Sequence, residues 1–221
     1  TGSNGKTTTT KIIANVLSKS SSTLKNYNNE IGMPLSIFYS KQNSNNLVIE
    51  MGAAKPGDIK YLSSILKPNI GVITNIGNSH LEKLKNIKGV LEVKSELVSN
   101  IKNGGYLVVP NENKEHLKFW KKIIRGKELI TFGTEKNADF YAINIKSSIK
   151  KQEFNIISDK YNIDHKIKTS LSGVHNIKNI LAAFAVSYLI ENSPKLFNQR
   201  LEKSTQVRQK QQKWIRGSLL I

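Results

Sequence analysis

The chain has 221 residues, enough for one large domain with a hydrophobic core of its own. It contains no cysteine, which excludes a disulfide framework and a thiolate zinc site. The formal net charge is +18, which favours anionic partners such as nucleotides, nucleic acid or acidic lipid. The lysines are scattered, however, so a lysine-rich coding bias explains this charge at least as well. No apolar run is long enough for a membrane span and no signal peptide is recognisable, so we expect a cytoplasmic protein.

The first ten residues contain the end of a phosphate-binding loop. Gly5-Lys6-Thr7 closes the pattern G-x-x-x-x-G-K-[ST], whose first glycine would stand one residue before Thr1. A helix predicted to begin at about Lys6 would point the positive end of its dipole at a bound polyphosphate. Lys6 would reach the β- and γ-phosphates, and the Thr7 hydroxyl would bind Mg²⁺. The residues expected to line the nucleotide's phosphates are Gly2, Ser3, Asn4, Gly5, Lys6 and Thr7. The alternative is a polar turn that only caps a helix.

Three segments follow before residue 51. Apolar residues at helical spacing extend the first helix through residue 17, and residues 18–23 read as a polar loop. Pro34 favours a short helix that reaches Tyr39. Residues 46–50 form a short apolar run that ends in Glu50, the pattern of a buried parallel strand with a carboxylate at its C-terminal end. Ligands bind at that edge of open α/β sheets, although an isolated acid there is more often only solvated.

A helix is predicted over residues 57–66, with Ile59, Leu62, Ile65 and Leu66 on one side, and a second buried strand over residues 70–76. His80 follows that strand and could be a metal ligand or a solvated side chain. Residues 87–101 are predicted to form one helix whose apolar stripe contains Ile87, Leu91, Val98 and Ile101. Lys94 stands in this stripe, where a lysine is unusual unless it snorkels to the surface.

The remaining pattern continues the alternation of strand and helix. Strands are predicted at 106–110 and 128–132, with a helix over about 113–124 between them. Residues 141–149, 153–158 and 162–169 read as consecutive antiparallel strands. A last helix runs from about 173 to 191, and His175 and Asn179 are expected to face away from its core stripe. Beyond Pro194 the sequence is polar and indicates no packing role. The fold class is therefore α/β, with a mainly parallel sheet flanked by helices and a small antiparallel sheet.

Taken in order, six stretches resemble the Mur ligases, the ATP-dependent ligases of bacterial cell-wall synthesis. They are TGSNGKTTT (1–9), NNEIGMPL (28–35), VIEMGA (48–53), PNIGVITNIGNSHLE (68–82), GVLEVKSEL (89–97) and GVHNIKNILAA (173–183). The Glu-Met-Gly-Ala after the strand and the Asn-Asn-Glu-Ile-Gly before it resemble the members that join D-alanyl-D-alanine to a UDP-N-acetylmuramoyl-tripeptide. The related folylpolyglutamate synthases usually have Gly-Lys-Gly-Ser in the phosphate loop, which differs from this chain.

The resemblance implies a reaction and a set of site residues. ATP would phosphorylate the peptide's terminal carboxylate, and the incoming amine would displace phosphate from the acyl-phosphate intermediate. Thr7, Glu50, His80 and Lys94 are implied for Mg²⁺, with Lys94 as a carbamate, and Lys6, His80 and Lys94 are implied in catalysis. His175, Asn176 and Asn179 are implied along the adenine and ribose. Asn28 and Asn29 match a substrate-side loop.

The resemblance also implies domain organisation. Residues 1–205 would form the central ATP-binding domain, with its first strand missing, and residues 206–221 would link it to an absent C-terminal domain. We expect a monomer that binds no nucleic acid and has no membrane span. Two alternatives stay open: a nucleotide-binding or nucleic-acid-binding module that uses the basic charge, and an inactive gene remnant.

Overall fold

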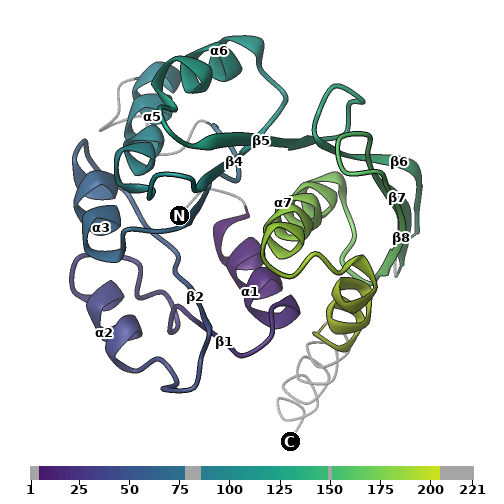
Figure 1. Cartoon of the computed structure of the whole chain (residues 1–221), viewed down its shortest axis with the longest axis horizontal. Coiled ribbons are helices and arrows are strands. Elements are labelled where there is room, and N and C mark those ends of the chain that lie inside the picture. Colours follow the sequence, from purple (N-terminus) through teal and green to yellow (C-terminus); the bar gives the residue numbers. More distant parts are fainter. Residues whose placement is uncertain (1–4, 78–85, 149–150, 205–221) are drawn as a thin grey trace, which may run out of the picture.

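The computed structural model describes residues 5–77, 86–148 and 151–204 (Figure 1). The helices are α1 (Lys6–Val16), α2 (Gly32–Phe38), α3 (Asp58–Leu66), α5 (Ile87–Ser95), the 3-10 helix η1 (Glu96–Asn100), α6 (Lys114–Ile123) and α7 (Val174–Glu191). The strands are β1 (Ser20–Ser22), β2 (Asn46–Val48), β3 (Ile70–Val72), β4 (Tyr106–Pro110), β5 (Glu128–Gly133), β6 (Phe140–Ser147), β7 (Gln152–Ser158) and β8 (Ile163–Thr169). No helix within these ranges is long and apolar enough to cross a membrane.

The strands form two sheets. β1 and β2 pair in parallel as a two-stranded sheet, and the other six strands form one sheet in the order β3-β4-β5-β6-β7-β8. Neighbours from β3 to β6 are parallel, whereas β7 is antiparallel to both of its neighbours, β6 and β8. The predicted α/β class with a mainly parallel sheet is confirmed. The antiparallel meander is also present, and it joins the parallel strands through the pairing of β5 with β6.

Helices cover both faces of the parallel strands (Figure 1). Alternate residues of β4 show this, because Val108 belongs to one apolar cluster while Leu107 and Val109 belong to another. The first cluster contains residues of α1 and α7, and the second contains residues of α3, α5 and α6. Strands buried on both faces are expected to be apolar throughout, and β4 reads Tyr-Leu-Val-Val-Pro.

Residues 194–204 are helical and contribute to the core, which their polar sequence did not indicate. The side chains of Phe197 and Leu201 are 1% and 0% exposed. The Phe197 ring meets the Phe184 ring of α7 edge to face, with centroids 5.0 Å apart. The Arg200 guanidinium pairs with the Glu191 carboxylate at the end of α7. These two apolar side chains are therefore enough to pack an otherwise polar segment onto the core.

Several local predictions are wrong. Residues 20–22, predicted within a loop, form β1, because pairing with β2 and the hydrogen bond between the Ser21 and Ser44 hydroxyls outweigh the low strand propensity of serine. The predicted burial of Ile87 is also wrong, since this residue is 46% exposed. The predicted helix over 87–101 ends as α5 at Ser95 and continues as the tighter η1, which changes the angular spacing of its side chains.

Candidate functional site

The start of α1 is built on a glycine. Gly5 caps the helix with φ of 107°, in the left-handed region that favours glycine. A Cβ added at Gly5 would also lie 2.4 Å from Oδ1 of Asn179, so a larger residue would collide with α7. The helix begins at Lys6, as the sequence predicts. Gly2, Ser3 and Asn4 lie outside the described residues.

Glu50 follows β2 and is held beside the first turn of α1. Its side chain is 7% exposed, and both carboxylate oxygens accept hydrogen bonds. The Thr7 hydroxyl donates to Oε2 at 2.8 Å, and the Asn28 amide donates to Oε1 at 2.9 Å. The backbone N–H of Glu50 donates to the Thr23 hydroxyl at 2.6 Å. The predicted parallel strand therefore does place its carboxylate next to the helix start, although β2 is not fully buried, since Leu47 is 36% exposed.

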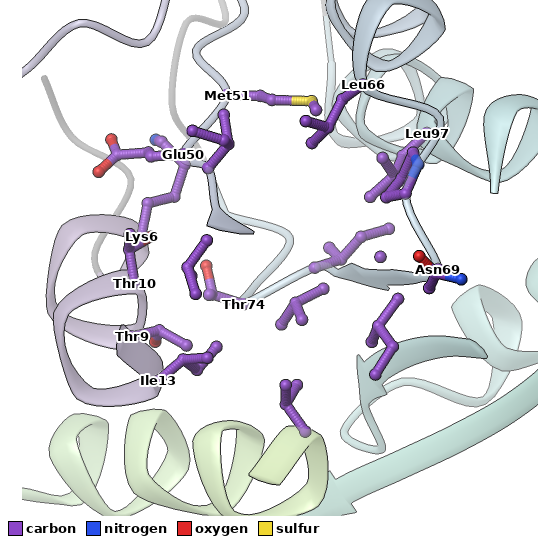
Figure 2. Close-up of a pocket in the computed structure, with 18 of the residues that line it drawn as sticks. Lys6, Thr9, Thr10, Ile13, Glu50, Met51, Leu66, Asn69, Thr74 and Leu97 are labelled. Atoms are coloured by element: carbon purple, nitrogen blue, oxygen red, sulfur yellow. The ribbon is translucent and has the colours of Figure 1, made fainter. Parts of the chain in front are cut away.

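Two lysines line one cavity with Glu50. The cavity has a volume of about 580 Å³, and Lys6 and Lys94 both contribute to its wall. Figure 2 shows Lys6 beside Glu50 on one side of the cavity, with Leu97 and Asn69 on the opposite side. Burial lowers the pKa of Lys6, although the negative charge of Glu50 acts in the opposite direction.

The amine of Lys94 is fixed at the end of β3. Its Nζ donates to the backbone carbonyl of Asn75 at 2.8 Å and to the side-chain Oδ1 of Asn75 at 3.2 Å. Burial, and then the positive charge of Lys6, lower the pKa of Lys94 to about 8. A substantial fraction of this amine is therefore neutral at slightly alkaline pH, whereas an ordinary lysine is almost wholly charged.

The N-terminal end of α7 lies close to α1. Asn179 accepts a hydrogen bond from the Thr9 hydroxyl at 3.2 Å and donates to Oδ1 of Asn176 at 3.3 Å. The expectation that Asn179 faces away from the core is wrong, because the residue is only 6% exposed. The helix is apolar on nearly all sides and α1 packs against it, so polar residues that meet α1 are buried too. His175, in the first turn, is exposed as expected.

The predicted site residues that remain are Asn28, Asn29 and His80. Asn28 and Asn29 both make hydrogen bonds to the backbone of nearby residues. The backbone carbonyl of Asn28 accepts a hydrogen bond from the Gly52 N–H at 2.7 Å, and Oδ1 of Asn29 accepts one from the Gly32 N–H at 2.8 Å. His80 lies outside the described residues, so its place beside Glu50 stays a prediction. Within the parts of the chain that the structure describes, no three or more His, Asp or Glu side chains gather as a metal-binding group.

Sequence reasoning missed two polar residues of this edge. Asn75 accepts a hydrogen bond from the Lys94 amine. The predicted strand extended through residue 76 and so included Asn75, whereas β3 ends at Val72. The Thr23 hydroxyl accepts a hydrogen bond from the Glu50 backbone N–H. Thr23 was predicted to lie in a polar loop, which gave no indication of this contact. The position of both residues after a strand could have indicated their role, because polar residues that follow neighbouring parallel strands meet at one edge of a sheet.

A mainly parallel sheet with a Gly-Lys-Thr turn opening the helix α1 defines an α/β domain of the phosphate-loop class. Residues 1–187 match the family described as the Mur ligase middle domain. The chain therefore belongs to the Mur ligase family, as its sequence predicts, and corresponds to the middle domain.

Curated relatives agree with this membership. The chain is 36% identical over 196 residues to UDP-N-acetylmuramoyl-tripeptide–D-alanyl-D-alanine ligase of Buchnera aphidicola, a match that covers 86% of this chain and 42% of the relative. It is 32% identical over 191 residues to the ligase of the same name from Escherichia coli, covering 85% of this chain and 42% of the relative. The chain thus spans less than half the length of these relatives.

Solved structures show the same fold. MurF from Acinetobacter baumannii superposes with a TM-score of 0.83 at 27% identity, covering 90% of this chain and 44% of that one. MurF ligase from Thermotoga maritima, solved in complex with ADP, superposes with a TM-score of 0.78 at 26% identity, covering 89% of this chain and 45% of that one.

Proposed function

We propose that this chain is the ATP-binding central domain of a cytoplasmic ligase that adds D-alanyl-D-alanine to a UDP-N-acetylmuramoyl-tripeptide during peptidoglycan precursor synthesis. The observation that carries the proposal is the convergence of the phosphate-loop end with Glu50 and Lys94 at one edge of the fold. The names of the relatives support the substrates, and the Thermotoga maritima structure, solved in complex with ADP, supports nucleotide binding.

The residues present fit a nucleotide with Mg²⁺. The first turn of α1 contains no acidic residue, and its N-cap residue, Gly5, makes no side-chain capping hydrogen bond in the described part of the chain. The helix start therefore favours an anion, and Lys6 adds a positive charge beside it. Glu50 and Thr7 supply a carboxylate and a hydroxyl side by side, and Mg²⁺ prefers such oxygen ligands. The nucleotide would supply the phosphoryl group that activates a substrate carboxylate. This chain's residues would bind and orient it and neutralise its charge.

Lys94 would have a separate role as a carbamate in the intact ligase. The neutral amine would attack the carbon of CO₂, form an N–C bond and release a proton to solvent. The product would carry a negative charge and two oxygens, both suited to a second Mg²⁺. Support comes from the lowered pKa of Lys94 and from the two hydrogen bonds that hold its nitrogen at Asn75.

Calorimetric titration of the 221-residue chain with ADP tests the nucleotide site. We expect weak binding that requires Mg²⁺, and little affinity for RNA or DNA. Polynucleotide binding that falls steeply with salt, together with no response to Mg²⁺ and ADP, would instead favour the nucleic-acid-binding alternative.

A second experiment tests the reaction. A longer protein that carries a UDP-sugar-binding domain ahead of this chain and an amino-acceptor domain after it should release phosphate only when ATP, UDP-N-acetylmuramoyl-tripeptide and D-alanyl-D-alanine are all present. The 221-residue chain alone should not, because much of the rate of such a reaction comes from positioning both substrates. Robust ligation by this chain alone would contradict the proposal that flanking domains bind the UDP-sugar substrate and the amino acceptor.

A further inference from the structure

Three loops gather at one edge of the six-stranded sheet. β3, β4 and β5 are parallel, so the segments that precede them lie at one edge of the sheet and the segments that follow them lie at the other. The three preceding segments are residues 67–69, 101–105 and 124–127. They are neighbours in space, because the Lys102 N–H donates to the Pro68 carbonyl at 3.0 Å and the Gly104 N–H donates to the Gly126 carbonyl at 2.8 Å.

This edge lies opposite the proposed nucleotide site. Asn75, which accepts a hydrogen bond from the Lys94 amine, follows β3, whereas Lys67 precedes it. Figure 2 shows Asn69, which also precedes β3, on the opposite side of the cavity from Glu50. A partner held at this edge would therefore leave the nucleotide site open.

Positively charged side chains collect here. Each of the three loops carries at least one, and the last turn of α6, which ends at this edge, adds two more. We call the set the basic edge; its members are Lys67, Lys102, Lys121, Lys122, Arg125 and Lys127. All but the half-buried Lys127 are exposed, and within the described ranges none of them forms an ion pair. The acid next to them in sequence, Glu128, has its carboxylate 3.9 Å from Nζ of Lys160 instead.

Neither helix dipoles nor composition accounts for the basic edge. The dipoles favour lysines at the ends of α3 and α6, but Lys102, Arg125 and Lys127 lie past the capping residues of η1 and α6. A lysine-rich coding bias would load both edges of the sheet alike. The segments that follow β4 and β5, residues 111–113 and 134–137, instead contain two glutamates and a single lysine. Gathered like charges also repel one another, so the cluster does not serve stability.

We propose that the basic edge binds the anionic headgroups of a membrane surface and holds the domain there with its nucleotide site facing away. Clusters of about four to eight Lys and Arg residues on one surface are typical of proteins that bind acidic phospholipid, and each such cation strengthens binding by about fivefold. The attraction is purely electrostatic. The apolar face of α6 packs into the core, where Trp120 is 0% exposed, so this helix has no apolar face left to insert into lipid.

The composition of the basic edge favours lipid over a polynucleotide, which also carries phosphates. Proteins that hold single strands stack the bases on aromatic side chains. Residues 67–69, 101–105 and 121–127 contain no aromatic residue. The headgroups of an anionic leaflet require no stacking, because the surface potential alone attracts the cations.

Flotation with lipid vesicles tests the proposal on the 221-residue chain. The chain should bind vesicles made of phosphatidylglycerol and phosphatidylcholine in about equal parts, and should not bind vesicles of phosphatidylcholine alone. Binding should weaken as salt is raised, because salt screens exposed charges.

Two double variants locate the binding surface. Lys102→Gln with Arg125→Gln takes one cation from each of two loops and should raise the anionic lipid needed for half-maximal binding by about twentyfold or more. The matched control, Lys55→Gln with Lys114→Gln, removes the same charge from exposed lysines ahead of α3 and at the start of α6. It should change that lipid concentration by less than about threefold. Circular dichroism checks that both variants are folded.

Three results would overturn the proposal. One is no binding of the folded chain to the anionic vesicles. Another is equal weakening by the two double variants, which would assign the binding to net charge rather than to the basic edge. The third is tighter binding to duplex or single-stranded DNA than to the vesicles, lost on Lys102→Gln with Arg125→Gln, which would assign the edge to a polynucleotide. None of these measurements uses nucleotide or Mg²⁺, so they do not depend on whether the nucleotide site is correct.

Discussion

The Thr7 hydroxyl donates a hydrogen bond to the Glu50 carboxylate at 2.8 Å, which joins the first turn of α1 to a residue just beyond the end of β2. The two residues are 43 positions apart in the sequence. In the proposed nucleotide site, this hydroxyl and this carboxylate would be the oxygen ligands of Mg²⁺.

Replacing Glu50 with glutamine should weaken Mg²⁺-dependent ADP binding by about tenfold or more, because the metal site loses its negative charge. The amide oxygen of glutamine can still accept the Thr7 hydrogen bond, although the Asn28 amide loses its acceptor, so the fold should remain with some loss of stability. Calorimetric titration with ADP, with and without Mg²⁺, measures the effect. Glu30→Gln is the matched control, since Glu30 is exposed, and it should bind as the unchanged chain does. Equal Mg²⁺ dependence in both variants would argue against Glu50 as a ligand.

Lys94→Ala in the full-length ligase should reduce turnover by about two orders of magnitude or more, because the proposed carbamate oxygens are lost from the phosphoryl-transfer site. Nucleotide binding should change little. Phosphate release measures turnover, and bicarbonate added after CO₂ removal should restore the unchanged enzyme but not the alanine variant. With ¹³C-labelled bicarbonate, a carbamate carbon signal should appear only when Lys94 is present. Near-normal turnover of the alanine variant would leave Lys94 as an ordinary packing residue.

The stability of the chain should depend on pH through Lys94. The folded-state pKa of about 8 lies below the ordinary 10.5, so the unfolded chain binds this proton more tightly and stability rises with pH between the two values. Below about pH 8 the folded state bears the whole cost of the buried charge, and above about 10.5 it bears none. Lys94→Met removes the ionisable group. The difference in unfolding free energy between variant and unchanged chain should therefore shift by about 2 kcal/mol between pH 7 and 9.5.

Urea unfolding in CO₂-free buffer at several pH values measures that difference. A constant difference across this range would show that the pKa of Lys94 is not lowered in the folded chain.

Two leucines in the terminal helical segment provide a matched test of its packing. Leu201→Ala should lower the free energy of unfolding by about 2–5 kcal/mol, because the side chain is 0% exposed and its loss leaves a cavity. Leu196→Ala should cost less than about 1 kcal/mol, since that side chain is 39% exposed. Chemical denaturation compares the two. Similar losses would mean that the segment is not packed on α7 as described.

Local sequence features determined most of the elements. The Gly-Lys-Thr turn marked the start of α1 at Lys6, and β4 was predicted with the bounds that the structure shows. The antiparallel strands and α7 followed from their periodicity. These predictions succeeded because turn residues and apolar spacing act within a few positions along the chain. The ordered stretches also indicated the Mur ligase family, which comparison with known proteins confirms.

Contacts between distant residues decided what remained. β1 is a strand of three serines because β2 lies beside it, and Phe197 and Leu201 are buried because α7 offers an apolar surface. Asn179 faces inward because Thr9 of α1 meets it. No local pattern contains these partners, since each contact joins segments far apart in the sequence. The pairing of Lys94 with Asn75, and the cavity that Lys6, Glu50 and Lys94 line, likewise exist only once the strands and helices are packed together.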